Sequence, residues 1–340
     1  MADRLSKTLQ PISGVQDGGN GDKPDVLRLE NLTVYYDTPR GAVHAVEDVS
    51  FSLHAGERLG LAGESGSGKS SMALTIMRLL KPPARIVGGS IWFGEDDLVT
   101  LPYDKMNELR LAQIALVAQG SMNSLNPVMR VRDQITDGLI DHGFKLTKTE
   151  LEEKVASLLT RVGLPPAVAD MFPYELSGGM KQRVVIAIAI SLRPRVIIAD
   201  ELTSALDVVV QRQVMETLKS VQSEIGASVI LVGHDMGLMA QFVERLAVMY
   251  AGRIMEIAPV RDIFRRPRHP YTQMLISSLP STEAKGEFKG IPGLPPSLIS
   301  APPGCVFHPR CPQAVERCQA EVPQFRELRS DSWVACHFAS

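Results

Sequence analysis

The sequence has 340 residues, 44% hydrophobic and 22% charged, an ordinary globular composition that suggests about two domains at roughly 150 residues each. With 36 basic and 38 acidic side chains the formal net charge is −2, which excludes a protein held on nucleic acid or anionic lipid mainly by its own charge. No run approaches about 18 consecutive apolar residues, and the N-terminus lacks the apolar core of a secretory signal. We therefore expect a soluble, intracellular chain without a transmembrane helix.

The first elements are predicted from composition and periodicity. Residues 1–24 are polar and rich in Gly, Asp and Ser, which predicts a disordered leader. LRLENLTVYY (27–36) and AVEDVSFSL (45–53) carry β-branched and aromatic residues with the partial alternation of half-buried strands. Residues 57–80 are typical of a strand, a glycine turn and an apolar-periodic helix that ends before the pair of prolines at 82–83.

Later segments predict a parallel sheet and a separate C-terminal region. RVIIAD (195–200) and SVILVGH (228–234) are apolar runs without alternation, typical of parallel strands buried on both faces, with QRQVMETLKSVQSEIG (211–226) as the crossover helix. Residues from about 120 to 190 are mostly helical in pattern. After residue 259 the composition changes, and GIPGLPPSLISAPPG (290–304) is a proline-rich connector into a cysteine-containing tail.

The segment GESGSGKS (63–70) satisfies G-x-x-x-x-G-K-[ST] between a predicted strand and a predicted helix. Its glycines let backbone N–H groups turn toward phosphates, and the following helix adds the positive end of its dipole. Lys69 should reach the β- and γ-phosphates, and the Ser70 hydroxyl should ligate Mg²⁺. A chance glycine turn rarely shows the full pattern in this context, so we predict a nucleotide site that includes Gly63, Glu64, Ser65, Gly66, Ser67, Gly68, Lys69, Ser70 and Ser71.

Two carboxylates follow the first of these buried runs. In VIIADE (196–201) the strand delivers Asp200 and Glu201 to its C-terminal end, the edge at which open α/β sheets bind ligands. Asp200 is placed to hold Mg²⁺, directly or through water, and Glu201 to polarise an attacking water or take its proton. Adjacent acids at a strand end are often only surface charges. The phosphate loop makes the catalytic interpretation the better one.

Further motifs stand in the order found in ABC-type ATPases, which the chain resembles from residue 26 to about 338. LSGGMKQR (176–183) is similar to the family signature, with Met where the commonest version has Gln. In that family the signature faces the γ-phosphate bound by the other subunit. The resemblance also implies a Q-loop glutamine that contacts Mg²⁺, a D-loop at the dimer interface, a switch histidine at the γ-phosphate and an aromatic side chain on adenine. The matching residues are Ser177, Gly178 and Gly179, then Gln119, Asp207, His234 and Tyr36, with Tyr35 as the alternative aromatic.

The resemblance narrows to the ATP-binding subunits of dipeptide and oligopeptide importers through LSGGMKQRV, RRPRHPYTQMLISSLP (265–280) and the cysteine tail. It implies an α/β fold: a P-loop nucleotide-binding domain at 25–258, with a RecA-like core, an antiparallel β edge and a helical subdomain at about 120–190. A small C-terminal domain would follow at 259–340. The chain would bind ATP and Mg²⁺ at the cytoplasmic face of the membrane. Its implied partners are a second, related ATP-binding subunit in a heterodimer, two transmembrane permease subunits and an extracytoplasmic solute-binding protein, with no nucleic acid.

The sequence departs from the family pattern at two places. Leu202 replaces the proline that usually follows the catalytic glutamate, and Ala118 and Gly120 replace the Phe and Asp that usually flank the Q-loop glutamine. Neither change removes a catalytic side chain, so we expect activity to be retained.

Two other function classes fit the sequence less well. A soluble ABC ATPase acting on DNA or ribosomes would carry a long coiled-coil insertion or a second cassette, and the sequence has neither. A regulatory protein that uses ATP only as a ligand would not need the residues suited to hydrolysis, namely Gln119, Asp200, Glu201 and His234.

All four cysteines lie in the tail, at Cys305, Cys311, Cys318 and Cys336. In a reducing cytosol such a cluster predicts a metal or iron–sulfur site rather than disulfides. The nearest pair is separated by five residues, unlike the tight pairs of zinc sites, and the spacing resembles the importer tail, which in some members holds a [4Fe–4S] cluster. We therefore predict a structural [4Fe–4S] cluster on the four thiolates, with zinc second and with His308 and His337 as neighbours.

Overall fold

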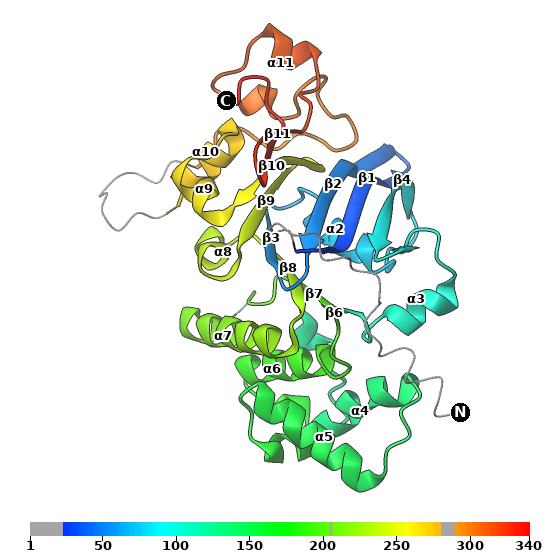
Figure 1. Cartoon of the computed structure of the whole chain (residues 1–340). Helices are drawn as coiled ribbons and strands as arrows, with labels where there is room; N and C mark the ends of the chain where they lie inside the picture. Colours follow the sequence, from blue (N-terminus) through cyan, green and yellow to red (C-terminus); the bar gives the residue numbers. More distant parts are fainter. Residues whose placement is uncertain (1–22, 205, 280–289) are drawn as a thin grey trace.

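The computed structural model describes residues 23–204, 206–279 and 290–340. The predicted leader at 1–24 thus lies outside the described residues except for its last two positions. Two β-sheets form the frame (Figure 1). The smaller one is antiparallel throughout, in the order β2-β1-β4-β5, and is the antiparallel edge that the resemblance implied. Its strands are β1 (Asp25–Thr38), β2 (Gly41–His54), β4 (Ala84–Phe93) and β5 (Asp96–Asp97).

The larger sheet has the order β11-β12-β10-β9-β3-β8-β7-β6. Its strands from β9 to β6 are parallel, and every residue of β7 and β8 is buried, which explains the unbroken apolar runs. The predicted crossover helix between β7 and β8 is confirmed as α7 (Val208–Ile225). The strands are β3 (Arg58–Ala62), β6 (Ile114–Val117), β7 (Val196–Asp200), β8 (Ser228–Gly233), β9 (Arg245–Tyr250), β10 (Arg253–Pro259), β11 (Arg326–Arg329) and β12 (Ser332–Val334).

Side chains of β7 alternate between two hydrophobic cores. Ile197 and Ala199 belong to the core shared with the helices between β6 and β8, and Val196 and Ile198 to the core shared with the small sheet. This alternation follows from the pleat of the strand, which sends successive side chains to opposite faces. At β7 the sheet is therefore covered on both faces.

The predicted helical segment at 120–190 is confirmed and lies in the lower part of Figure 1. Its helices pack on one another, and α6 packs on α7. They are η2 (Ser121–Asn123), α4 (Val131–Asp141), α5 (Lys148–Arg161), η3 (Pro166–Asp170), η4 (Pro173–Glu175) and α6 (Gly178–Ala189). The remaining helices are α2 (Lys69–Ile76), α3 (Tyr103–Leu109), α8 (Met236–Phe242), α9 (Val260–Arg265), α10 (Pro270–Ser277), η5 (His308–Arg310) and α11 (Glu316–Ala320).

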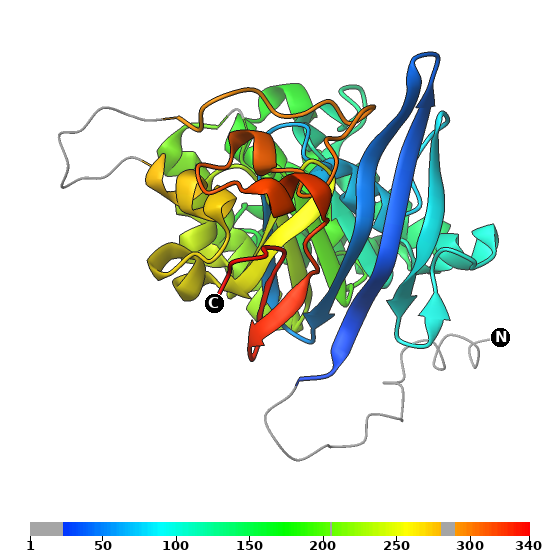
Figure 2. The same cartoon turned by 90° about the horizontal axis from the view of Figure 1, so that it is seen from above.

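The C-terminal tail packs on the main sheet instead of forming a core of its own. Strand β12 pairs with β10 and so extends the larger sheet, and Figure 2 shows the orange and red tail lying across the yellow strands. Cys305, Val306 and Phe307 belong to the same hydrophobic core as the helices that cover β7. The prediction of a separate small domain from residue 259 is therefore not confirmed by the packing.

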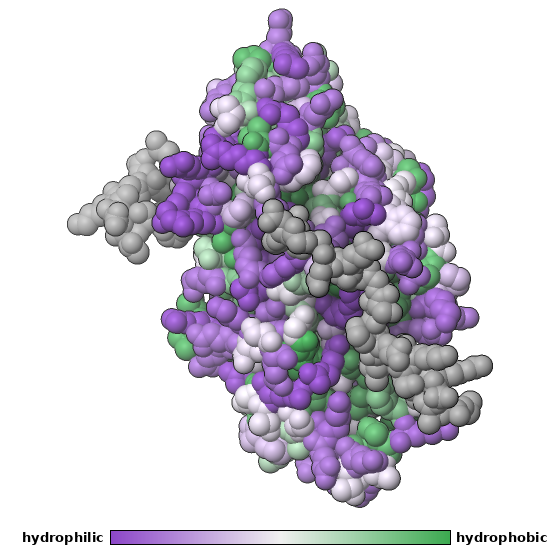
Figure 3. All heavy atoms as spheres, in the orientation of Figure 1, coloured by the Kyte–Doolittle hydropathy of each residue, from purple (hydrophilic) through white to green (hydrophobic). Residues whose placement is uncertain are grey.

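The surface in the view of Figure 3 is mostly hydrophilic, with hydrophobic residues in separate small groups. Across the described ranges, no helix combines the length and the apolar character needed to span a bilayer.

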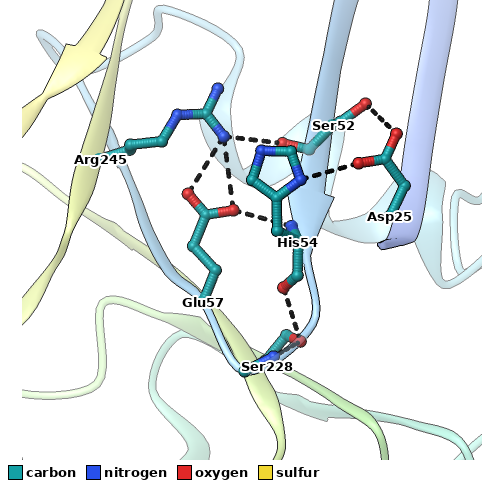
Figure 4. Close-up of polar contacts among 7 residues, drawn as sticks. Asp25, Ser52, His54, Glu57, Ser228 and Arg245 are labelled. Atoms are coloured by element: carbon teal, nitrogen blue, oxygen red, sulfur yellow. Dashed lines mark hydrogen bonds and ion pairs between the residues drawn. The ribbon is translucent and has the colours of Figure 1, made fainter. Parts of the chain in front are cut away.

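A polar network joins the ends of β2, β3 and β9 (Figure 4). Glu57, only 4% exposed, lies 3.1 Å from Arg245 and accepts the backbone N–H of His54 at 2.8 Å. The His54 ring lies 2.8 Å from the Asp25 carboxylate, whose hydrogen bond raises the pKa of the ring, and the Ser228 hydroxyl donates to the His54 carbonyl. The network thus ties the small sheet to the large one through buried charges.

Replacing Glu57 by alanine should destabilise the fold, because Arg245 would remain as a mostly buried cation without its partner. We expect the free energy of unfolding to fall by about 3 kcal/mol, the usual cost of breaking a buried ion pair. Urea unfolding followed by circular dichroism measures this. Glu216→Ala, which breaks an exposed pair with Arg212 on α7, is the control and should change little. Equal midpoints for the two variants would contradict a structural role for the network.

Candidate active site

The phosphate loop at residues 63–68 connects β3 to α2, as predicted. Gly63 and Gly68 have φ values of 153° and 102°, which disfavour other residues. A Cβ on Gly63 would lie 2.0 Å from the Met249 carbonyl oxygen, and one on Gly68 would lie 2.0 Å from that of Ala45. The loop is therefore packed directly against the backbones of β9 and β2, and no side chain fits between them.

Lys69, the first residue of α2, points its ammonium group back over the loop. Its Nζ donates to the carbonyls of Gly63 and Glu64, both at 2.9 Å, and lies 3.3 Å from the Ser67 hydroxyl. Burial lowers the pKa of Lys69, while the nearby Glu201, Asp200 and Glu64 carboxylates act in the opposite direction. A cation held at the centre of a glycine loop is the arrangement that contacts phosphate oxygens.

Asp200 ends β7 and is 4% exposed, and its Oδ1 has no hydrogen-bond partner. Burial raises the pKa of this carboxyl group, the Ser70 hydroxyl lowers it by a hydrogen bond, and Glu201 and Lys69 act in opposite directions. A buried carboxylate oxygen without a partner, next to a serine hydroxyl, fits a hard cation such as Mg²⁺. The donor set at Ser70 and Asp200 therefore suits the metal that the loop implied.

Glu201 lies between two side chains from neighbouring strand ends. The Gln119 amide, which follows β6, donates to one carboxylate oxygen at 2.6 Å, and His234 Nδ1, which follows β8, lies 3.4 Å from the other. The backbone of Glu201 has a φ of 48°, unusual outside glycine, and its N–H donates to the Val232 carbonyl. The structure thus brings together Gln119, Glu201 and His234, which are far apart in the sequence.

Tyr36, rather than Tyr35, faces the phosphate-loop helix. The Tyr36 hydroxyl lies 3.1 Å from that of Ser71 on α2. Tyr35 instead stacks on His44 and donates to Glu47. This geometry favours Tyr36 as the aromatic residue beside the nucleotide.

The signature and D-loop residues cap two helices, α6 and α7. Ser177 accepts the Met180 N–H at the start of α6, and Asp207 accepts the Val210 N–H at the start of α7. Ala205 of the D-loop lies outside the described residues. Where side chains are described, no hydrogen bond or ion pair joins residues 177–179 to the phosphate loop. In one chain, the phosphate loop and the signature residues are therefore two separate parts of the predicted ATP site, with no described hydrogen bond or ion pair between them.

Both departures from the family pattern have a structural setting. Leu202 is buried in the core that covers the helical side of the sheet. Gly120 has a φ of 67° and precedes η2, so it turns the chain directly after Gln119. The contacts of Glu201 with Gln119 and His234 are present alongside both changes.

Comparison with known proteins connects this geometry to a family. Residues 46–204 match the family described as ABC transporter, and residues 255–318 match the oligopeptide/dipeptide transporter C-terminal region. The oligopeptide transport ATP-binding protein OppD of Escherichia coli is 44% identical over 301 residues, covering 88% of this chain and 89% of its own. The dipeptide transport ATP-binding protein DppD of Bacillus subtilis is 43% identical over 311 residues, covering 90% and 92%.

The chain belongs to the ATP-binding subunits of oligopeptide and dipeptide ABC transporters. Among solved structures, a dimeric post-hydrolysis state of the ATP-binding cassette MJ0796 bound to ADP and Pi aligns with a TM-score of 0.62 at 28% identity. The alignment covers 69% of this chain and 99% of the MJ0796 chain. The resemblance, the ABC fold and the ATPase class predicted from the sequence are thereby confirmed.

The predicted [4Fe–4S] cluster is wrong for this importer subunit. All four cysteines are free, and in the described ranges no three His, Cys, Asp or Glu side chains are arranged to hold a metal ion. The names of the matching importer subunits describe ATP-binding proteins of peptide transport and no iron–sulfur centre. The same geometry overturns zinc, the second choice.

The four thiols differ in their environments. Cys305 and Cys318 are buried, and burial raises the pKa of Cys305 to about 11 and also raises that of Cys311. Spacing in the sequence indicates that cysteines are concentrated but not how they are buried or aimed. The two histidines named as neighbours bond to carbonyls, His308 to Cys305 and His337 to Glu321.

Aromatic packing performs the ordering that we assigned to a metal. The fully buried Phe307 ring lies 5.2 Å from Tyr250, 5.3 Å from Tyr271 and 5.8 Å from His269. The Cys305 N–H also donates to the Cys318 carbonyl at 2.8 Å, which closes the tail on itself. The importer tail is thus held by the common core.

Two contacts to the phosphate loop were missed in the sequence. Tyr271 and Arg310 both reach Glu64 from the C-terminal region. Tyr271 lies in the segment that served only as a family marker, and nothing in the local pattern around Arg310 signals its partner. The signal in the sequence was Glu64 itself, because an acidic side chain within a phosphate-binding loop needs a cationic partner.

Phe307→Ala should destabilise the full chain by about 3–5 kcal/mol, the usual cost of removing a buried aromatic ring. Urea unfolding followed by circular dichroism measures the change. Phe338→Ala removes a ring in the same tail that is 53% exposed, and it should have little effect. Similar midpoints for both variants would show that packing of Phe307 does not order the tail.

Proposed function

We propose that this subunit powers peptide import by closing on ATP against a second, related ATP-binding subunit, with Glu201 as the base that activates water. The observation that carries this proposal is the position of the Glu201 carboxylate, bonded to Gln119 at 2.6 Å and 3.4 Å from His234. As a family member the subunit is an ATPase that acts with membrane permease subunits and a substrate-binding protein, at the cytoplasmic face of the membrane.

The residues suited to the nucleotide surround the phosphate loop. Lys69 and the loop N–H groups would bind the β- and γ-phosphates, and Tyr36 would stack on adenine. Ser70 and Asp200 would hold Mg²⁺, with Gln119 beside them, and the bound metal would neutralise negative charge on the phosphates. The buried Asp200 Oδ1 without a hydrogen-bond partner supports this assignment.

Hydrolysis then needs one oriented base. Water adds to the γ-phosphorus as the bond to the β–γ bridging oxygen breaks, and Glu201 takes the proton that the water loses. Gln119 and His234 orient the carboxylate through the two contacts given above. The His234 side chain is 68% exposed, so it can also turn toward the γ-phosphate.

The separation of the two halves supports a dimer. Ser177, Gly178 and Gly179 lie at the start of α6, without a described bond to the phosphate loop of the same chain. Two chains in head-to-tail arrangement would place each signature on the other chain's phosphates, and MJ0796, a structural relative, is described as dimeric. We propose that the second chain is a related subunit, with Asp207 near the interface.

The alternatives have less support. The matched relatives are transport proteins, so a soluble ATPase acting on DNA or ribosomes is not favoured. A protein that only binds ATP would have no use for a carboxylate held by both Gln119 and His234.

Glu201→Gln should lower steady-state ATP hydrolysis by at least about 100-fold while leaving ATP bound, because the proton acceptor is lost and the phosphate loop is not. Phosphate release by the subunit assembled with its transporter partners measures turnover, and equilibrium dialysis measures binding. Glu216→Gln, on the exposed face of α7, is the matched control. Turnover close to that of the control would contradict the assignment of the base.

Lys69→Ala should weaken binding of Mg-ATP by about tenfold or more, since a charge-assisted contact to phosphate is lost. Equilibrium dialysis measures the dissociation constant. The control is Lys219→Ala, an exposed lysine on α7. An unchanged dissociation constant for Lys69→Ala would show that the loop at 63–70 is not the phosphate site.

A further inference from the structure

Among the described residues, the hydrogen bonds from the C-terminal region (259–340) to the phosphate loop all go to Glu64, from two directions. The Glu64 backbone N–H donates to the Tyr271 hydroxyl at 3.0 Å. Its carboxylate receives two hydrogen bonds from the Arg310 guanidinium, at 2.7 Å and 3.0 Å. Arg310 lies 246 positions further along the chain, in η5. Both the main chain and the side chain of a loop residue are thus fixed by the tail.

Arg310 is bound on every side. Its side chain is 4% exposed, and besides Glu64 it donates to the Tyr250 hydroxyl and to the carbonyls of Pro292 and Ile291. Each of the five N–H donors of a guanidinium therefore has an acceptor. Its charge is buried and paired with the Glu64 carboxylate. Removing one partner of a buried ion pair is strongly destabilising, because the other charge is left uncompensated.

Tyr271 is held in place by an equally continuous chain of contacts. Glu256 on β10 accepts the His269 N–H at 2.9 Å, and the His269 ring accepts the Tyr271 N–H at 3.0 Å. Burial lowers the pKa of His269 to about 3, so its ring is neutral and free to accept. The hydroxyl of Tyr271 is therefore presented to the loop by the main sheet.

Glu64 needs this compensation because of where it lies. Its carbonyl is one of the acceptors of the Lys69 ammonium, and its carboxylate charge acts on Lys69. A free carboxylate here would repel a triphosphate and compete with it for Lys69. The bidentate ion pair with Arg310 neutralises the Glu64 carboxylate and fixes the position of the Glu64 side chain.

We propose that Arg310, together with Tyr271, is a positioning residue for ATP binding: the tail neutralises and anchors Glu64 so that the phosphate loop accepts a triphosphate. This inference rests on the proposed role of the loop at 63–70. It gives the C-terminal region a function in the nucleotide site.

The test is the dissociation constant of Mg-ATP for the full-length subunit, measured by equilibrium dialysis at about 50 and about 500 mM salt. Arg310→Met keeps the apolar stem and removes the charge, and we expect about tenfold weaker binding at low salt, the effect of one uncompensated charge near an anion. The deficit should shrink at high salt because it is electrostatic. Arg317→Met is the matched control, since Arg317 lies in the same tail and pairs with the exposed Glu321.

A second substitution separates charge from structure. Adding Glu64→Gln to Arg310→Met should restore binding to within about twofold of wild type, because the repelling carboxylate is gone. Glu64→Gln alone should bind Mg-ATP a few-fold more tightly, because the charge of Arg310 is then no longer cancelled. Circular dichroism shows whether Arg310→Met folds. If it does not, the Glu64→Gln variant alone still tests the proposal.

Three results would overturn the inference: wild-type affinity in folded Arg310→Met, a salt-independent loss that Glu64→Gln does not reverse, or weaker binding in Glu64→Gln alone. The Lys69→Ala variant keeps the two claims apart. If Lys69→Ala loses ATP and Arg310→Met does not, only the role of the tail is wrong. If Lys69→Ala binds ATP normally, the loop itself has been misassigned.

Discussion

The parallel order of β3, β8, β7 and β6 is the constraint on which the site depends. Parallel strands deliver their C-terminal ends to one edge, and the chain places a different chemical group after each of them. The phosphate loop follows β3, Gln119 follows β6, Asp200 and Glu201 end β7, and His234 follows β8. Because both faces of the sheet are covered by apolar cores, this edge is where polar groups of the central strands can meet solvent and ligand.

Buried charge is used in three distinct ways around this sheet. Glu57 and Arg245 are paired at 3.1 Å and tie the two sheets together. Arg310 and Glu64 are paired at 2.7 Å and tie the tail to the loop. Among the carboxylates of the described residues, Asp200 alone keeps a buried oxygen without a hydrogen-bond partner. Since an unpaired buried carboxylate is costly, this exception supports the proposal that an external cation would bind at Asp200.

The fold and the site could be predicted from the sequence where the chemistry is local. The loop at 63–70, its strand and its helix are neighbours along the chain, and the full pattern of glycines before Lys69 is typical of phosphate-binding loops. The pair at 200–201 follows an unbroken apolar strand, so its place at the sheet edge could also be predicted. The roles of Gln119 and His234 came from resemblance, because no local pattern states that they will meet Glu201.

The tail could not be predicted in the same way. Whether Phe307 packs in the main core, and whether Arg310 finds Glu64, depends on contacts between residues tens to hundreds of positions apart. Four concentrated cysteines predicted a metal, but concentration along the chain does not determine the geometry of the side chains, and the described residues hold no group of three side chains arranged for a metal ion. The tail instead packs on the nucleotide-binding domain. Phe307 lies in the hydrophobic core of that domain, and Arg310 bonds to its phosphate loop.

An experimental structure of the full-length Glu201→Gln subunit with Mg²⁺ and ATP tests this account most directly. We expect phosphates cradled by residues 63–70, the metal bound by the Ser70 hydroxyl with Asp200 beside it, and residue 201 facing the γ-phosphate. A nucleotide bound elsewhere, or a metal away from both Ser70 and Asp200, would contradict it.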